Sequence, residues 1–290
     1  MGIRVNTLGI AGVGLIGGSI GLAARANGFA GRVLGIGRSE SRLRAALDAG
    51  AIDSFTTDFA EGARQSDLLY LAAPVGVIIE QIRGLSSISD VEIVVTDAGS
   101  TKAEIVRAAS ALPPNIRFVG GHPMAGSEES GVEAASDSLF HGAVYALTPD
   151  TQTNPAALDT VRALAQAVGA RVLLLCAEEH DRAVAITSHL PHIVAGIFVR
   201  LAARGGEHMA SLTAGSFRDL TRVAGSPSAL WGDISITNAG AILDAAREFR
   251  DALDEIESLI RAGDAEGTRE WFAGNSAIRN LLTSSGEEKL

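Results

Sequence analysis

The sequence predicts an α/β protein in which a doubly wound, mostly parallel sheet is followed by an all-helical second half. Strand and helix patterns alternate over the first part of the chain, and no convincing strand pattern follows Glu178. A glycine series after the first strand is the third observation. We therefore expect a dinucleotide-binding domain over residues 1–176 and a helical domain over residues 177–290.

The glycine series lies between the first strand and the first helix. The apolar residues 5–10 predict a buried strand, and the small and apolar residues 15–26 predict a helix. Between them, Gly12, Gly14 and Gly17 fit the pattern G-x-G-x-x-G. In a Rossmann-type fold these glycines allow a tight turn, a close approach to a pyrophosphate, and close packing of helix on strand. This context favours nucleotide binding over a turn that only packs the helix.

Further segments complete the predicted sheet. Strands are expected at residues 32–36, 67–73, 92–97, 116–119, 144–147 and 172–175. Helices are expected at residues 39–49, 75–85, 102–112 and 155–168. Repeated βα units of this size imply right-handed crossovers and a parallel sheet.

The second half predicts long helices. One covers residues 180–203, with a kink expected at Pro191, and another covers residues 244–261 and is ended by Gly263. The later helix carries an apolar stripe close to helical spacing, at Ala245, Phe249, Ala252, Leu253, Ile256, Leu259 and Ile260. The stripe fits a dimer seam, and it fits equally well a face packed in the chain's own core. We expect a homodimer formed through the helical domain.

Composition narrows the classes of function. The net charge of −10 argues against a general binder of nucleic acid or of anionic membranes. The single cysteine, Cys176, excludes an intrachain disulfide and a CxxC metal site. We see no signal-peptide pattern and no uninterrupted apolar run of membrane-spanning length. We therefore expect a cytoplasmic protein with a small-molecule substrate and without nucleic-acid or membrane partners.

The end of the second strand indicates the cofactor. An acid there binds the 2′-hydroxyl of NAD, whereas an arginine accommodates the 2′-phosphate of NADP. Gly37 stands where the acid is expected, and Arg38 and Ser39 follow it, which favours NADP over NAD. Glu40 would serve NAD if the register differed by a few residues, and Arg38 would then be a solvated charge. The expected cofactor contacts are Gly12, Gly14, Leu15, Ile16, Gly17, Arg38, Ser39, Ala73, Pro74 and Asp97.

Polar groups gather in four stretches, at residues 97–102, 120–131, 187–192 and 217–222. His122 directly follows a predicted strand, so it is a candidate to accept a proton from an alcohol as hydride leaves, unless it is only structural. His189 and His192 lack a third ligand nearby, so no metal is expected. Arg218 and Arg222 share a helix face and would clamp carboxylates, unless they form a surface network with Asp219.

These motifs together resemble the prephenate/arogenate dehydrogenases of tyrosine biosynthesis. The likeness runs from Leu8 to about Leu259 and rests on the motifs at residues 12–21, 97–102, 121–128, 188–192 and 217–222, with Trp231-Gly-Asp233. It implies a Rossmann domain, a helical dimerisation domain, and an NAD- or NADP-dependent oxidative decarboxylation. The substrate would be prephenate, giving 4-hydroxyphenylpyruvate, or arogenate, giving tyrosine, and the sequence leaves that choice open.

The resemblance also implies roles for single residues. His122 would take the proton of the ring hydroxyl, and Ser100 would hydrogen-bond that hydroxyl or His122. Arg222 would bind the ring carboxylate. The other residues expected in the substrate pocket are His192, Glu128, Ser127 and Arg218.

The chain departs from the family pattern at Gly37, where NAD-preferring relatives often carry an acid, and at Gly232, where an arginine is common. No regulatory domain follows and no chorismate mutase segment precedes, so we expect a monofunctional enzyme. One alternative is another dehydrogenase of this architecture, of the β-hydroxyacid or imine reductase type. The scarcity of lysine, with only Lys102 and Lys289, counts against its lysine-dependent form. The other alternative is a non-catalytic NADP sensor, against which His122 and Arg222 argue.

Overall fold

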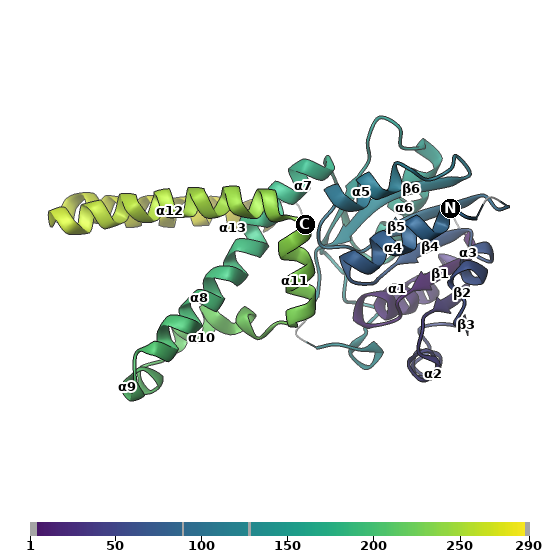
Figure 1. The fold of residues 1–290 in the computed structure, drawn as a ribbon, viewed down its shortest axis with the longest axis horizontal. Helices are drawn as coiled ribbons and strands as arrows, with labels where there is room; N and C mark the ends of the chain where they lie inside the picture. Colours follow the sequence, from purple (N-terminus) through teal and green to yellow (C-terminus); the bar gives the residue numbers. More distant parts are fainter. Residues whose placement is uncertain (1–4, 89, 127–128, 288–290) are drawn as a thin grey trace. The chain divides into compact units, whose positions relative to one another are not determined.

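The sheet of the computed structural model is doubly wound, as the sequence predicts. The structure describes residues 5–88, 90–126 and 129–287. In that part, eight strands form one sheet in the order β3-β2-β1-β4-β5-β6-β7-β8 (Figure 1). They are β1 (Val5–Ala11), β2 (Ala30–Ile36), β3 (Ser54–Thr56), β4 (Leu68–Leu71), β5 (Ile93–Asp97), β6 (Ile116–Pro123), β7 (Val144–Thr148) and β8 (Arg171–Leu174). Only the β6–β7 pair is antiparallel.

Helices cover both faces of this sheet with separate apolar clusters. One cluster joins the strands to α1 (Leu15–Ala26), α2 (Glu40–Asp48) and α6 (Pro155–Ala167). The other joins them to α3 (Phe59–Arg64), α4 (Val75–Leu85) and α5 (Ala103–Ala109). Because both faces are buried, the strands consist of nearly continuous apolar residues, which is the pattern that made them predictable.

Several predicted elements differ from the structure. The sequence analysis missed β3 and α3, which are too short for a clear period, although Asp58 caps α3 by accepting from Glu61 N–H at 3.1 Å. Helix α5 ends at Ala109 rather than at residue 112, because a residue before proline is disfavoured in a helix and Pro113 follows. Strand β6 continues past residue 119 to Pro123, because antiparallel pairing with β7 extends it.

The second half is helical in the part of the chain that the structure describes. Its elements up to residue 237 are α7 (Ala177–Val184), the π-helical turn η2 (Ala185–His189), α8 (Leu190–Arg204), α9 (Glu207–Ser211), α10 (Gly215–Thr221), the 3₁₀ turn η3 (Arg222–Gly225) and α11 (Ser228–Thr237). The irregularity expected at Pro191 takes the form of η2. Proline has no N–H to donate to the preceding turn, so the helix widens there.

The stretch 177–204 is long and apolar enough to cross a membrane by length and composition. Polar residues interrupt it, so the expected absence of an uninterrupted apolar run is not contradicted. Charged residues occur only near its two ends, and 28% of its most apolar window is buried. A helix that presents an apolar face to another protein surface meets the same criteria, so this signal alone does not indicate a membrane.

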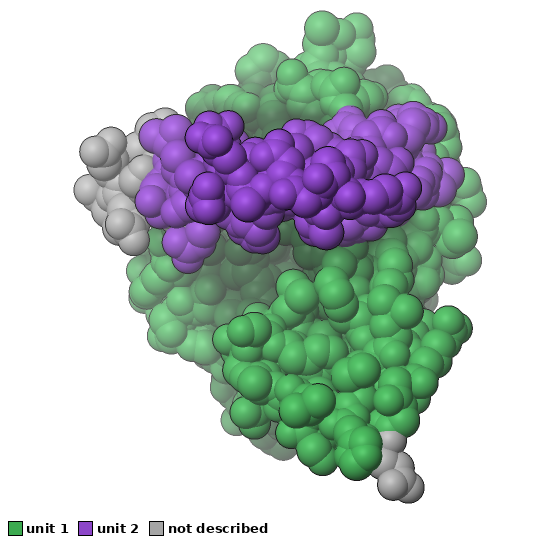
Figure 2. Space-filling view, turned by 90° about the vertical axis from the view of Figure 1, so that its left-hand side faces the viewer, with its two compact units in different colours: residues 1–239 green, residues 240–290 purple. Residues whose placement is uncertain are grey.

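The chain divides into two compact units, residues 1–239 and 240–290, which Figure 2 shows in different colours. The second unit contains most of α12 (Ala239–Ala262), followed by α13 (Ala265–Glu287). Gly263 ends α12 with a φ of +65°, as predicted, and Asp264 caps α13 by accepting from Gly267 N–H at 2.9 Å. Several members of the predicted apolar stripe are exposed, namely Phe249, Leu253 and Ile260.

Candidate active site

Two glycines of the turn between β1 and α1, Gly12 and Gly17, have no room for a side chain. Gly12 has a φ of +100°, and a Cβ there would lie 2.3 Å from the carbonyl oxygen of Ala72. A Cβ on Gly17 would lie 2.1 Å from the carbonyl oxygen of Gly12. Among the described residues, nothing lies within 4 Å of a Cβ built on Gly14, and no side chain caps the start of α1 there. The free N–H groups of that helix start suit an anion.

A cavity of about 1170 Å³ opens beside this turn. Residues 12–14 line it from the turn, and Ala73 and Pro74 line it from the end of β4. It therefore lies at the point where the strand order reverses, which is where open α/β sheets bind ligands. The pyrophosphate of an NAD(P) cofactor fits this cavity, because the glycines carry no side chains, the start of α1 is uncapped and the volume is sufficient. Two further predicted contacts form the first turn of α1 and are partly buried, namely Leu15 and Ile16.

The far part of this cavity carries two arginines. Arg38 and Ser39 line it as predicted, and Arg42, which the sequence analysis did not single out, lines it as well. The Ser39 hydroxyl caps α2 by accepting from Arg42 N–H at 3.4 Å. Glu40, the acid considered for NAD, instead pairs with Arg44 at 2.6 Å and does not line the cavity. Arg38 and Arg42 thus bring two cationic side chains to the cavity, whose lining also includes Glu80 and Glu133.

A buried ion pair lies at the end of β5. Lys102 Nζ pairs with Asp97, and both side chains are fully buried. Lys102 Nζ also donates to the carbonyl oxygen of Gly121 at 2.8 Å, while Asp97 Oδ1 accepts from Gly121 N–H at 3.0 Å. The Asp97 carboxylate has no exposed surface and faces Lys102, so its predicted contact with the cofactor stays a prediction. The pair holds Gly121, the residue before His122, from both sides.

His122 lies on β6 itself, although the sequence predicts it in a loop. It pairs with Ala146 of β7 in the antiparallel register that extends the strand. Its Nδ1 lies 2.8 Å from Nε2 of His180, and the two rings meet edge to face with centroids 5.0 Å apart. Nδ1 of His180 lies in turn 2.8 Å from Oδ1 of Asp181. Three side chains from β6 and α7 therefore form one chain of hydrogen bonds.

Sequence reasoning missed His180 and Asp181. A histidine and an aspartate at the start of a long apolar helix were the available signal, because such polar residues are buried only with partners. Asp181 also accepts from the N–H groups of Lys102 and Ala103, at 2.7 and 2.9 Å. Its carboxylate therefore joins α7 to the start of α5.

The surroundings of His122 keep its imidazole neutral. Burial lowers the pKa of His122 well below its ordinary value of 6.5, and the nearby His180, Lys102 and His189 lower it further. His122 as a whole residue is only partly buried. At neutral pH it therefore offers an unprotonated nitrogen to a ligand, as a proton acceptor requires.

Two more histidines lie around Trp231. His192 stacks on its indole with centroids 3.5 Å apart, and donates from Nδ1 to the carbonyl oxygen of Ser188 at 2.9 Å. His189 meets the same indole edge to face and accepts from Asn238 Nδ2–H at 3.1 Å. Burial lowers the pKa of His189 to about 4. The predicted residue His192 thus has a fixed ring with Nε2 left for a ligand.

The structure describes the surroundings of the remaining predicted site residues to different extents. Burial lowers the pKa of His192, the hydrogen bond to Ser188 opposes that shift, and the charge of Arg222 adds to it, so Arg222 lies near His192. Arg218 is exposed on α10, and in the described part of the chain no salt bridge joins it to Asp219. Ser100 is partly buried in the loop after β5. Two predicted pocket residues, Ser127 and Glu128, lie outside the described residues.

Comparison with known proteins decides the family. The profile described as prephenate dehydrogenase, nucleotide-binding domain, matches residues 20–174, and the one described as prephenate dehydrogenase, dimerization domain, matches residues 176–274. The chain belongs to the prephenate dehydrogenase family. It is therefore an oxidoreductase, and the alternatives of a β-hydroxyacid or imine reductase type and of a cofactor sensor are set aside.

Relatives of the family resemble the whole chain. The prephenate dehydrogenase of Bacillus subtilis is 38% identical over 96% of this chain and 76% of its own length. A structure of prephenate dehydrogenase from Aquifex aeolicus, in complex with hydroxyphenyl propionate and NAD+, superimposes with a TM-score of 0.91 at 31% identity, covering 97% of this chain and all of that one. Synechocystis arogenate dehydrogenase gives a TM-score of 0.83 at 28% identity, over 95% of this chain and 99% of that one.

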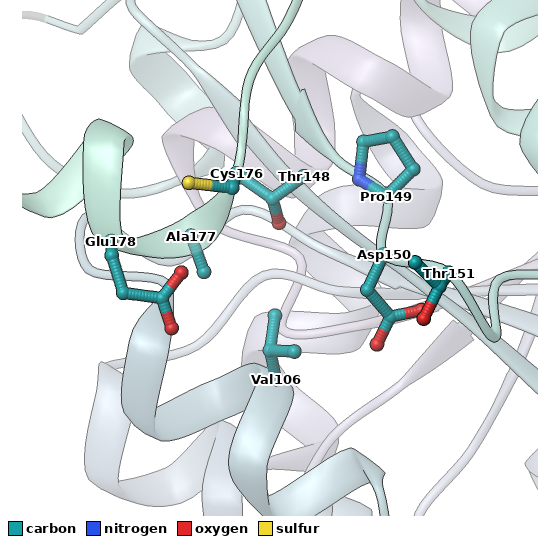
Figure 3. Close-up of a pocket in the computed structure, with 8 residues that line it drawn as sticks. All are labelled: Val106, Thr148, Pro149, Asp150, Thr151, Cys176, Ala177 and Glu178. Carbon is teal, nitrogen blue, oxygen red and sulfur yellow. The ribbon is translucent and has the colours of Figure 1, made fainter.

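This member of the prephenate dehydrogenase family has a second cavity, of about 460 Å³, near the end of β7 and the start of α7 (Figure 3). Its ionisable side chains are those of Asp150, Glu178 and the exposed Cys176. The described lining includes no basic side chain, so this cavity does not suit an anionic cofactor or substrate.

Proposed function

We propose that this enzyme catalyses the oxidative decarboxylation of prephenate or arogenate, with His122 accepting the proton of the ring hydroxyl. The single observation that carries the assignment is a partly exposed His122 that the protein keeps neutral, on the same sheet edge as the cofactor cavity. The bound NAD(P)+ supplies the hydride acceptor. His122 removes the hydroxyl proton as hydride leaves the ring, and the loss of CO2 makes the ring aromatic, so the step is effectively irreversible.

The other predicted residues bind and orient the substrate. The Ser100 hydroxyl, at the end of the neighbouring strand β5, hydrogen-bonds the ring hydroxyl or His122. Arg222 binds the ring carboxylate, and His192, fixed by Ser188 and Trp231, lines the pocket beside it. Arg222 serves binding more than chemistry, because an arginine that held the leaving carboxylate tightly would stabilise the ground state. Three further residues complete the proposed pocket, namely Ser127, Glu128 and Arg218.

The assay that tests this function uses the purified chain with each cofactor, NADP+ or NAD+, and each substrate, prephenate or arogenate. We expect cofactor reduction accompanied by 4-hydroxyphenylpyruvate or tyrosine. The four rates also rank the substrates and the cofactors. Absence of turnover in all four combinations, in a folded protein that binds NADP+, would refute the proposal.

We propose NADP+ as the preferred cofactor. Arg38 and Arg42 both line the far end of the cavity, and Ser39 lies between them, whereas Glu40 is held by Arg44. Two guanidinium groups stabilise the extra phosphate of NADP+, and the only acid considered for the ribose of NAD+ faces elsewhere. The NAD+ complex of the Aquifex aeolicus relative shows that the family also includes an NAD+-binding member.

Three single variants test the cofactor choice. Arg38→Ala and Arg42→Ala each remove a charge from the cavity, so we expect the KM for NADP+ to rise about tenfold, as for a lost charge-assisted hydrogen bond, with the KM for NAD+ nearly constant. Arg64→Ala, which pairs with Asp90 outside the cavity, is the matched control and should change neither. Equal losses for both cofactors would contradict recognition of the 2′-phosphate.

We propose that the helical part also makes a homodimer in the cytoplasm, and we retain a domain boundary at residues 176–177. The end of the nucleotide-binding profile at residue 174 supports that boundary. The exposed apolar residues Phe249 and Leu253 on α12 favour the dimer seam over a face packed in the chain's own core. Phe249→Glu should weaken the dimer in sedimentation experiments, whereas the exposed polar change Glu255→Gln should not.

A further inference from the structure

The hydrogen-bond chain from His122 to Asp181 has a defined direction. Carboxylate oxygens only accept, and both oxygens of the Asp181 carboxylate already accept from backbone N–H groups. The carboxylate must therefore accept from Nδ1–H of His180, at 2.8 Å. A neutral His180 then carries no proton on Nε2, and this nitrogen accepts from Nδ1–H of His122. The lone pair of His122 Nε2 is thereby left for the substrate.

Several contacts hold this chain in place. His180 and Asp181 are 2% and 4% exposed, so water does not compete for their hydrogen bonds. The carboxylate is fixed by the N–H groups at the start of α5, and Asn238 donates to the carbonyl oxygen of Asp181 at 2.8 Å. On the other side, Lys102 and Asp97 hold the backbone of Gly121 next to His122. Both ends of the hydrogen-bond chain are therefore anchored, and Lys102 takes part in both anchors, through its backbone N–H at Asp181 and its side chain at Gly121.

The same chain offers a place for the proton that the reaction releases. When His122 takes a proton on Nε2, its own Nδ1 proton can pass across 2.8 Å to Nε2 of His180. The positive charge then lies on His180, in direct contact with the carboxylate of Asp181, instead of on His122. One proton enters the hydrogen-bond chain and one proton moves within it, so the transfer balances without any other group.

We propose that His180 and Asp181 are positioning residues that set the tautomer of His122 and take over the charge when His122 accepts the substrate proton. This inference rests on the role of His122 proposed above. His180 and Asp181 touch neither the cofactor cavity nor the exposed part of His122. Their replacement should therefore leave ligand binding intact.

The first test measures the tautomers directly. The ¹⁵N chemical shifts of histidine-labelled protein distinguish a protonated from an unprotonated ring nitrogen, and the signals of His122 and His180 are assigned by their disappearance in His122→Asn and His180→Gln. At neutral pH we expect a proton on Nδ1 and none on Nε2 in both residues. A proton on Nε2 of His122 would overturn the proposal. The proton positions are read from the wild-type protein, whether or not the assay finds turnover, and the two variants serve only to assign its signals.

The second test uses two replacements that each keep one of the two contacts. The side-chain amide of His180→Gln reaches His122 but cannot take a proton, and that of His180→Asn reaches Asp181 but not His122. We expect kcat to fall by roughly 10- to 100-fold in both, a part of the ~10²–10⁴ that general bases contribute, with substrate KM and NADP+ Kd within about twofold of wild type. His208→Gln, an exposed control, should leave all three constants unchanged.

The outcomes separate the two proposals. Near-normal kcat in either His180 variant, or a loss seen mainly in KM or Kd, would overturn the role of His180. Near-normal kcat in His122→Asn would instead refute the proposed role of His122, on which the relay depends. Loss of kcat in all three variants with intact binding supports both.

Discussion

The cofactor cavity and the His122 hydrogen-bond chain are two parts of one sheet edge that are encoded differently. The glycine turn at residues 12–17 is determined by neighbours in sequence, because a strand, a tight turn and a helix follow one another. The His122 chain brings together residues 58 positions apart, and the carboxylate of Asp181 binds backbone 79 positions away. Residues close in sequence therefore form the nucleotide site, while the proton-accepting site requires α7 to fold against the sheet.

The largest expected effect is a loss of kcat in His122→Asn, and it tests whether the His122 hydrogen-bond chain acts in chemistry alone. His122→Asn keeps a polar side chain of smaller size but removes the basic nitrogen, so kcat should fall by about 10²–10⁴, the usual contribution of a general base. The Kd for NADP+, measured by fluorescence titration, should stay within about twofold, because His122 does not line the cofactor cavity. A large loss of cofactor affinity would show that the two parts of the site are not separable.

The second prediction concerns the ion pair that anchors the chain. Lys102→Met leaves the carboxylate of Asp97 buried without its cation, which typically costs about 3–5 kcal/mol in free energy of unfolding. Arg44→Met is the matched control, because it breaks an exposed pair with Glu40 that is worth about 0.3–0.5 kcal/mol. Urea denaturation measures both values. Equal stability changes for the two variants would mean that burial of the Lys102 pair does not matter.

These contrasts explain what the sequence could predict. The fold class, the glycine turn and helix α1 at residues 15–26 were predictable because apolar periodicity and glycine spacing are local signals. His122 and Arg222 were found as candidates from their places after a strand and on a helix face, and their particular roles came from motifs that resemble a family. The burial of Asp97 and the partners of His122 were not predictable, because a polar residue next to a strand looks the same in sequence whether it faces a ligand or a buried lysine. Arg42 was missed for a similar reason, since charged residues on a helix are usually solvated.

The third prediction separates two glycines of the same turn. Gly12→Ala places a methyl group 2.3 Å from a backbone oxygen at a φ of +100°, so it should lower the free energy of unfolding by about 1–3 kcal/mol. Gly14→Ala meets no described atom and has a φ of −101°, so stability should stay within about 0.5 kcal/mol. Its methyl group points into the space proposed for the pyrophosphate, and the Kd for NADP+ should rise. Normal NADP+ affinity in Gly14→Ala would place the pyrophosphate elsewhere.

The smallest expected effect is a pH dependence of stability that arises on the helical side of the site. Burial lowers the pKa of His189 to about 4, while neighbouring Asp181 raises it and His180 and His192 lower it. Between pH 6.5 and about 4 the unfolded chain therefore binds more protons at this residue than the folded chain does, so the free energy of unfolding falls as the pH is lowered through this window. Burial of His122 acts in the same direction. Thermal melts at pH 7.5 and pH 5 measure the slope, and His189→Gln, whose side-chain oxygen can still accept from Asn238, should reduce it. The exposed control His208→Gln should leave the slope unchanged. An unaltered slope in His189→Gln would mean that protonation of His189 does not destabilise the folded protein. The pH dependence of stability would then arise from His122 and its partners alone.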